Sequence, residues 1–206
     1  RMQDILPVVC RSFPEAIVSI DSFHHQVAAN AVEAGAHIIN DISGGLMDAN
    51  MIPTVASLGV PYVCMHMKGS PQTMQSMAQY KNITLELVDY FTERIAACRA
   101  AGIKDIILDP GLGFAKTIAQ NFELLDKLDA LKIHGYPLLL GVSRKSMIAK
   151  TLGISASESL NGSTVLHTIG LMRGADILRV HDVKEAVQAV DLYQALKKTS
   201  DVYPIE

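Results

Sequence analysis

The sequence predicts an α/β fold in which parallel strands form a (β/α)8 barrel, and three observations lead to this prediction. Short apolar, β-branched segments alternate with longer segments of helical period. The strand segments are apolar almost throughout, as in parallel sheets that helices cover on both faces. Glycines stand just before the strands, where the end of a helix needs a left-handed residue; they are Gly35, Gly59, Gly102, Gly135 and Gly174.

Six of the eight βα repeats of such a barrel are expected in this chain. The expected strands are "AIVSID" (16–21), "HIIND" (37–41), "PYVCMHM" (61–67), "DIILDPG" (105–111), "PLLLGVS" (137–143) and "DILRVHD" (176–182). The expected helices cover 23–34, 80–101, 119–131, 159–173, a short helix in "KSMIAKTLG", and a last helix with Val183, Ala186, Val190 and Tyr193 on one face. No change in composition divides the chain, which indicates a single domain over residues 1–206.

Composition and charge argue against several classes of protein. The 206 residues are 49% hydrophobic and 19% charged, as in an ordinary globular chain. A net charge of −3 provides no general attraction for nucleic acid or for an anionic membrane. The apolar runs are shorter than the roughly 18 residues that a membrane-spanning helix needs. Cys10, Cys64 and Cys98 are odd in number and widely spaced, which favours free thiols and a cytoplasmic location.

Each expected strand ends in polar residues that an apolar core does not tolerate. In a parallel α/β barrel or a doubly wound sheet, the ligand binds at the carboxyl ends of the strands. Polar residues on every strand suit a closed ring, so a barrel fits better than a doubly wound sheet. The residues are Asp21, then Asn40 with Asp41, His66, Asp109, Ser143 to Ser146, and finally Arg179 with His181 and Asp182.

Several of these residues also have simpler structural explanations. Asp21 could cap the helix that follows it, and Asn40 with Asp41 could be turn residues. The segment "DPGLGF" (109–114) could be a structural loop, and it lacks the spacing of a nucleotide phosphate loop. His66, between two methionines, is typical of a core histidine. No pair of His or carboxylate residues has metal-ligand spacing, so no metal ligand is expected in this chain.

The cations are harder to explain by structure alone. Arg179 lies within an apolar strand, so it needs an anion, either Asp109 or a neighbour or a ligand. Lys145 and Ser146 are expected in the first turn of a helix, which favours bound anions. Arg144 could be no more than a surface charge. The residues therefore predict a heteroaromatic ligand held by carboxylates and an amide, with an anionic group held by Arg, Lys and His.

Six segments in this order resemble the dihydropteroate synthase family of folate biosynthesis, over roughly residues 1–197. They are "SIDSF", "IINDISGG", "CMHMKGSPQTMQ", "ILDPGLGFAKT", "LLLGVSRKSMI" and "LRVHDV". The resemblance implies a (β/α)8 barrel and a transferase. Such an enzyme condenses 6-hydroxymethyl-7,8-dihydropterin pyrophosphate with p-aminobenzoate, giving 7,8-dihydropteroate and pyrophosphate.

The resemblance also implies a set of residues for the pterin ring. Asp109 would bind the 2-amino and N3 edge of the ring. Asn40, Asp21 and Lys145 would contact the ring, and Met65 would pack against it.

The remaining roles concern the anionic end and the second substrate. Arg179 and His181 would hold the pyrophosphate. Phe114 and Ser146 would line the p-aminobenzoate site, where sulfonamide drugs compete in this family. The residues expected to act in catalysis are Lys145, Asp109, Arg179 and His181.

The chain departs from the family at its beginning. A first strand and loop resembling "NVTPDSFSDGG" and a second loop ending in "STRPG" are not found, and residues 1–13 resemble the end of the helix after the second strand. The first two strands are therefore expected to be missing. The asparagine that helps to bind Mg²⁺ with the substrate pyrophosphate belongs to the first of these loops. We accordingly expect this chain alone to bind pterin weakly and not to turn over.

Two alternatives to this function remain open. A pterin-binding methyltransferase domain would share the barrel, but it would have no use for the anion-binding groups in "SRKS" and "RVHD". A non-catalytic paralogue or fragment would keep the fold only. As partners, the family resemblance predicts the two substrates and a homodimer for the complete enzyme, whereas nucleic acid and membranes are not expected.

Overall fold

Six parallel strands form an open arc in the computed structural model, which describes residues 4–202. Strands β1 to β4 pair in chain order in one sheet, and β5 pairs with β6. A parallel bridge between Leu108 and Leu138 joins β4 to β5, so all the strands follow one another around the arc. The strands are β1 Ser19–Asp21, β2 Ile38–Asp41, β3 Tyr62–Met65, β4 Ile106–Asp109, β5 Leu139–Leu140 and β6 Ile177–Leu178.

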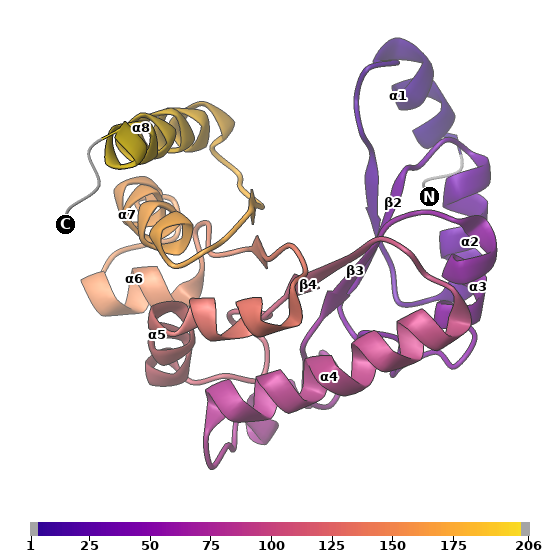
Figure 1. Ribbon diagram of the computed structural model, residues 1–206, viewed down its shortest axis with the longest axis horizontal. Helices are drawn as coiled ribbons and strands as arrows, with labels where there is room; N and C mark the ends of the chain where they lie inside the picture. The colour runs from indigo at the N-terminus through magenta and orange to yellow at the C-terminus, as the bar shows by residue number, and fades with distance from the viewer. Residues whose placement is uncertain (1–3, 203–206) are drawn as a thin grey trace.

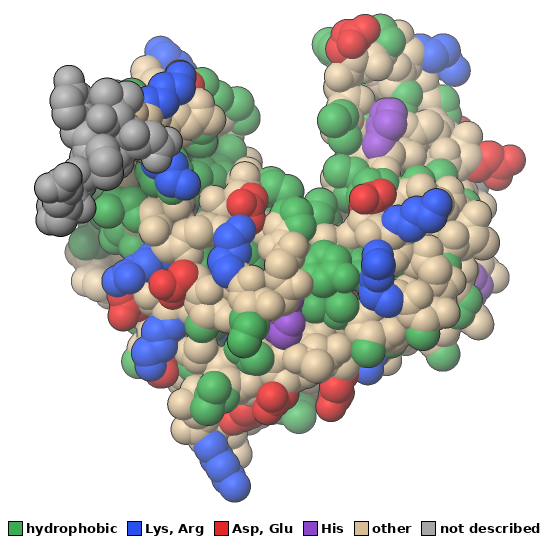
Figure 2. Space-filling view, viewed as in Figure 1, with side chains coloured by type: hydrophobic (Ala, Val, Ile, Leu, Met, Phe, Trp, Pro, Cys, Tyr) green, Lys and Arg blue, Asp and Glu red, His purple; other side chains and the backbone are tan. Residues whose placement is uncertain are grey.

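Helices connect the strands and cover the outside of the arc (Figure 1). Helices α1 and α8 lie at the two ends of the arc, and the molecular surface is hollowed between these ends (Figure 2). The helices are α1 Leu6–Ser12, α2 His25–Glu33, α3 Met51–Leu58, α4 Ile83–Ala101, α5 Ile118–Asp126, α6 Ser146–Leu152, α7 Leu160–Met172 and α8 Val183–Val202. Two 3-10 helices are added, η1 Met74–Met77 and η2 Leu128–His134. Within residues 4–202, no helix is both long and apolar enough to cross a membrane.

All six expected strands are present, but the last two are much shorter than predicted. The prediction gave seven residues to each, 137–143 and 176–182, whereas β5 and β6 contain two each. On both sides of this pair, hydrogen bonds to side chains take the place of backbone hydrogen bonds between the strands. The Leu138 amide donates to Asp176 Oδ2 at 2.8 Å, and the His181 amide donates to Ser143 Oγ at 3.2 Å. The pattern of apolar residues in the sequence cannot reveal such hydrogen bonds to side chains.

The expected helices are also present, and the structure adds elements that the prediction did not contain. Helix α3 carries Pro53 in its first turn, where the missing N–H is tolerated. The segment expected as a helix over 119–131 divides into α5 and η2, and the expected loop near 74–77 contains η1.

The core lies between the strands and the helices that cover them. Every residue of β3 is buried, and the fully buried side chains of Tyr62, Ile39 and Phe91 belong to β3, β2 and α4. The five glycines before the strands all have positive φ, as predicted; Gly59 and Gly102 are the left-handed C-caps of α3 and α4. This packing fixes the carboxyl ends of the strands, where the polar residues lie.

Candidate active site

Four polar side chains from different strands meet at the carboxyl end of the arc. The pairing of β1 with β2 sets Asp21 beside Asn40, and the Asn40 amide nitrogen donates to Asp21 Oδ1 at 2.5 Å. Arg179, which follows β6, lies with Nη1 3.9 Å from Asp21 Oδ2. Its Nη2 lies 3.7 Å from Asp109 Oδ2. Residues from both ends of the arc therefore surround one site.

Asp109 is the most buried of these groups, with 1% of its surface exposed. Its Oδ1 accepts a hydrogen bond from the Gly111 amide at 2.8 Å. Its Oδ2 is buried and has no hydrogen-bond partner among the described residues, and the same is true of Asn40 Oδ1. Burial raises the pKa of Asp109, while Arg179 and Lys145 act in the opposite direction. A buried acceptor without a donor calls for an explanation, and a ligand with N–H groups would satisfy both of these acceptors.

The guanidinium group of Arg179 lies against the backbone of Gly141, just beyond β5. A Cβ atom on residue 141 would stand 3.1 Å from Nη2 and 3.2 Å from Nε of Arg179. Glycine therefore leaves room for the arginine to reach the two carboxylates. At 3.7 and 3.9 Å these ion pairs are loose, so a bound anion could replace either of them.

Lys145 lies beside the loop that follows β4. Its Nζ donates to the Leu112 carbonyl and lies 4.8 Å from the centre of the Phe114 ring. Burial lowers the pKa of Lys145 to about 8, whereas the neighbouring Asp109 raises it. One detail of the prediction is wrong, because Lys145 is the N-cap of α6 and not part of its first turn. Ser146 is the first residue of α6 and is exposed.

His181 and Met65 complete the set of expected residues. His181 is exposed, and its Nδ1 lies 3.0 Å from Oγ of the buried Ser143. Met65 is fully buried at the end of β3, next to Asp109 in the strand register. The chain passes closely over this strand end, since a Cβ on Gly111 would be 2.2 Å from the His66 carbonyl oxygen. Gly111 has φ +66, so both its conformation and its surroundings require glycine.

The sequence-based prediction missed Lys116, the buried residue around which the loop after β4 folds. Lys116 is 5% exposed, and its Nζ donates to the carbonyls of Gly111 and Phe114 at 3.0 Å each. The same nitrogen lies 3.0 Å from Nδ1 of His66. Burial lowers the pKa of His66 to about 2, so its neutral ring can accept this hydrogen bond. A lysine followed by threonine in "FAKT" gave no signal of burial.

Arg144 is not a free surface charge, which corrects the prediction. Its Nε donates to Asp182 Oδ2 at 2.9 Å and its Nη2 donates to Asp182 Oδ1 at 2.8 Å.

Asp41 has a structural role, because its carboxylate accepts from the Ser43 amide, the Gly45 amide and the Tyr62 hydroxyl. The alternative of Asp41 as a turn residue is thereby borne out.

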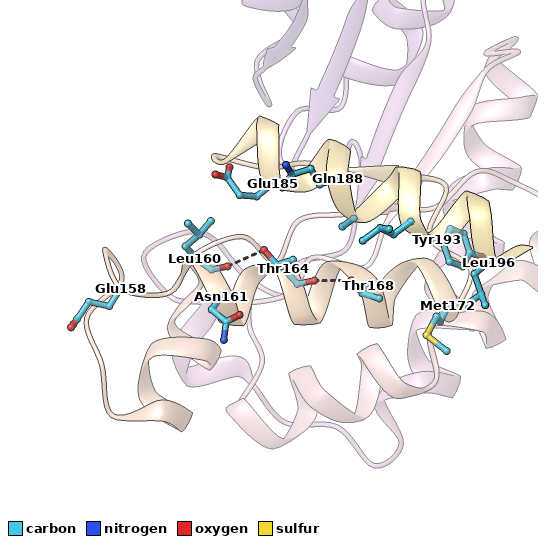
Figure 3. Close-up of a pocket in the computed structure, with 12 residues that line it drawn as sticks. Glu158, Leu160, Asn161, Thr164, Thr168, Met172, Glu185, Gln188, Tyr193 and Leu196 are labelled. Atoms are coloured by element: carbon cyan, nitrogen blue, oxygen red, sulfur yellow. Dashed lines mark hydrogen bonds between the residues drawn. The ribbon is translucent and has the colours of Figure 1, made fainter.

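A groove of about 700 Å³ lies away from these residues, between α7 and α8 (Figure 3). Leu160, Met172, Tyr193 and other residues of both helices line it. The hydroxyl of Thr164 donates to the Leu160 carbonyl of its own helix, so its proton is already used within the helix. The groove contains none of the residues that meet at the strand ends, and it is a separate surface.

Comparison with known proteins identifies the family. The model of the pterin binding enzyme family matches residues 1–181. The dihydropteroate synthase of Escherichia coli (strain K12) is 41% identical over 200 residues, which are 95% of this chain and 70% of that protein. The chain belongs to the dihydropteroate synthase family.

Solved structures of dihydropteroate synthases have the same fold. The Yersinia pestis enzyme in a sulfonamide drug complex matches with a TM-score of 0.93 at 35% identity, over 97% of this chain and 73% of that one. The Thermus thermophilus enzyme matches with a TM-score of 0.89 at 34% identity, both in complex with 4-aminobenzoate and in complex with 6HMPPP. These matches cover 94% of this chain and 75% or 77% of the other. The predicted barrel class is confirmed, and the relatives support dihydropteroate synthase over the methyltransferase alternative.

Proposed function

We propose that the polar residues at the strand ends of this chain serve the condensation of 6-hydroxymethyl-7,8-dihydropterin pyrophosphate with p-aminobenzoate, the reaction of its family. The observation that carries this proposal is the buried Oδ2 of Asp109, which has no hydrogen-bond partner among the described residues. The buried Oδ1 of Asn40, two strands away in the same sheet, also has none. The 2-amino and N3 groups of a pterin are N–H donors that would fit these acceptors. Asp21 and Lys145 would complete the contacts to the ring, with Met65 packed against it.

The anionic end of the substrate would lie against the cations. Arg179 and His181 follow β6, and each is near groups of β5 or of the loop after it. We assign both to the pyrophosphate. A diphosphate would replace the loose contacts of Arg179 with short, charge-assisted hydrogen bonds. Lys145, near Asp109 and Arg179, would contact both parts of the substrate.

The chemistry follows from placement and electrostatics. The amine nitrogen of p-aminobenzoate attacks the methylene carbon of the pterin, a C–N bond forms, and the C–O bond to pyrophosphate breaks. The amine then loses one proton. Asp109 and Asp21 would stabilise positive charge that develops on the pterin, while Arg179 and Lys145 would stabilise the leaving pyrophosphate. The reaction needs no covalent nucleophile from the protein.

Phe114 and Ser146 are our candidates for the p-aminobenzoate site. Phe114 is half-buried beside Nζ of Lys145, and Ser146 is exposed at the start of α6. Sulfonamides would compete at this position.

Magnesium remains an expectation from the family, as a companion of the substrate pyrophosphate. Among residues 4–202, no group of three His, Cys, Asp or Glu side chains is placed to hold a metal ion. The described residues therefore do not fit a protein-held metal, and we assign no metal ligand and no reaction step to it.

Replacing Arg179 with alanine should selectively weaken binding of the pyrophosphate-bearing substrate. We expect a loss of roughly 10- to 100-fold, because hydrogen bonds to charged groups contribute about 1.5–3 kcal/mol. Affinity for free 6-hydroxymethylpterin should fall much less. Calorimetric titration of both ligands measures the difference, and it reports on the site whether or not the chain turns over.

Arg173→Ala is the matched control for this experiment. Arg173 pairs with Asp126 at 2.5 Å on the surface, far from the strand ends in the fold, so its loss should leave both affinities unchanged. If Arg179→Ala lost affinity for both ligands by the same factor, the assignment of Arg179 to the pyrophosphate would be contradicted.

We also propose that the protein forms a homodimer through α7 and α8. Met172 of α7 and Leu192 of α8 are exposed apolar side chains that line the groove of Figure 3. Val165 and Ile169 of α7 and Val187 of α8 are also exposed on these two helices. A patch of this kind is typical of a protein interface. Leu192→Lys should shift the protein to monomers in sedimentation velocity, whereas Leu85→Lys on the exposed face of α4 should not.

Two further expectations belong to the proposal. We place the protein in the cytoplasm, because Cys10, Cys64 and Cys98 all have free thiols. We also treat the chain as one domain; residues 1–3 and 203–206 of the expected range 1–206 lie outside the described residues.

A further inference from the structure

We propose that Arg144 and Asp182 form a clamp that sets the spacing of the two anion-binding loops, so that Arg144 is a positioning residue for the pyrophosphate. The first loop, 141–145, lies between β5 and α6 and contains Ser143 and Lys145. The second loop, 179–182, follows β6 and contains Arg179 and His181. This inference rests on the proposed function, because it concerns how the same site holds its anion.

The clamp joins the two loops by a bidentate ion pair. Nε of Arg144 donates to Oδ2 of Asp182 at 2.9 Å, and Nη2 donates to Oδ1 at 2.8 Å. The side chains are 27% and 18% exposed, so the pair is shielded from much of the solvent. Two parallel hydrogen bonds fix the direction of both groups, and a single contact between point charges would not do so.

Arg144 is itself held firmly by a third part of the chain. Its Nη1 donates to the carbonyls of Ala156 and Ser157 at 3.1 and 2.7 Å, and its amide donates to Ser163 Oγ at 2.9 Å. The residue has φ +53, a left-handed conformation that is uncommon outside glycine. Such a conformation persists where surrounding contacts determine it. The clamp is therefore anchored to the start of α7 and its preceding turn.

The loops need this link because the strands below them are short. The ladder between β5 and β6 joins only Leu139 with Ile177 and Leu140 with Leu178 in the described register. The Arg179 amide then donates to the Leu140 carbonyl at 2.9 Å. Beyond that point, the two loops are joined by the contacts of His181 with Ser143 and by the clamp.

The clamp also compensates the negative charge of Asp182, which lies beside the site. Asp182 directly follows His181, so a free carboxylate there would repel a bound diphosphate. The hydrogen bonds from Arg144 hold the pKa of Asp182 below its usual value, so the carboxylate stays ionised and the adjacent guanidinium offsets its charge. His181 and His167 also lie close enough to interact electrostatically with this carboxylate. The two effects, spacing and charge, both act on the anionic end of the substrate and leave the ring site alone.

Three variants test the clamp by calorimetric titration with the pyrophosphate-bearing pterin, free 6-hydroxymethylpterin and inorganic pyrophosphate. Arg144→Met should weaken both pyrophosphate ligands about tenfold and the free pterin by less than about threefold. Arg144→Lys, which keeps the charge without the bidentate geometry, should give an intermediate loss. Asp182→Asn breaks the pair without leaving a free carboxylate beside the site, so it should weaken both pyrophosphate ligands less than Arg144→Met does. Arg144→Lys covers the case in which Arg144→Met does not fold. Arg173→Met removes a surface arginine–aspartate pair and serves as the control.

Each outcome decides the proposal. Equal losses of affinity for all three ligands would mean that Arg144 is only structural, and unchanged pyrophosphate binding in Arg144→Lys would overturn the clamp. The proposed function fails separately, if the unaltered chain binds inorganic pyrophosphate but neither pterin. If the unaltered chain does not bind inorganic pyrophosphate, the two loops are not an anion site and the clamp has no role.

Discussion

Asp109→Asn should weaken pterin binding by about 100-fold or more. The Gly111 amide donates to Oδ1 of residue 109, and an asparagine would keep its oxygen there. Its NH2 group would then take the position of Oδ2 and face the N–H donors of the ring. The variant loses charge-assisted hydrogen bonds worth about 1.5–3 kcal/mol each and adds a donor–donor conflict. Calorimetric titration with free 6-hydroxymethylpterin measures the change.

The control substitution is Asp105→Asn, at the opposite end of the same strand. Asp105 is exposed just before β4, so its loss should leave pterin affinity unchanged. Because burial raises the pKa of Asp109, Asp109→Asn should not lower thermal stability, which separates binding from folding. Unchanged affinity in Asp109→Asn would remove the basis of the pterin assignment.

Lys116→Met should destabilise the fold by about 3 kcal/mol near neutral pH. The methionine fills similar space but leaves three acceptors without a donor, namely His66 Nδ1 and the carbonyls of Gly111 and Phe114. Each unsatisfied buried group costs about 1–3 kcal/mol, partly offset because no ammonium is buried. Urea denaturation measures the difference in the free energy of unfolding. The control is Lys104→Met, because Lys104 is exposed and lies just before β4.

The contribution of Lys116 to stability should depend on pH. Burial lowers the pKa of Lys116 to about 7 in the folded protein, whereas an unfolded lysine titrates near 10.4. Between these values the unfolded chain binds more protons, so the contribution of Lys116 to stability rises with pH. The stability difference between the unaltered chain and Lys116→Met should be flat below about pH 6.5. It should then increase above pH 7 by up to about 1.4 kcal/mol per pH unit. A flat difference up to pH 9 would show that Lys116 stays protonated in the fold.

The residues of the candidate site that could be predicted from the sequence share one property. Asp21, Asn40, Asp109 and Arg179 each end or interrupt an apolar strand, so periodicity alone makes them conspicuous. A parallel fold then brings the strand ends to one side, and the contacts among these four residues follow from that rule.

The residues that escaped prediction act through loops. Lys116 and Arg144 find their partners 50 and 38 residues away in the chain, His66 and Asp182 respectively, and no local pattern encodes those pairs. Their burial depends on the path of the loops, and left-handed residues such as Ala115 and Arg144 determine part of that path. The lengths of β5 and β6 escaped for a related reason, since Asp176 and Ser143 side chains take the place of ladder partners.

The most direct test of the central claim is a crystal structure of the protein with 6-hydroxymethyl-7,8-dihydropterin pyrophosphate. We expect the N–H edge of the ring within hydrogen-bond distance of Asp109 Oδ2 and Asn40 Oδ1, and the pyrophosphate on Arg179 and His181. A ligand bound in the groove between α7 and α8, or a ring that leaves Asp109 Oδ2 unpaired, would contradict the account.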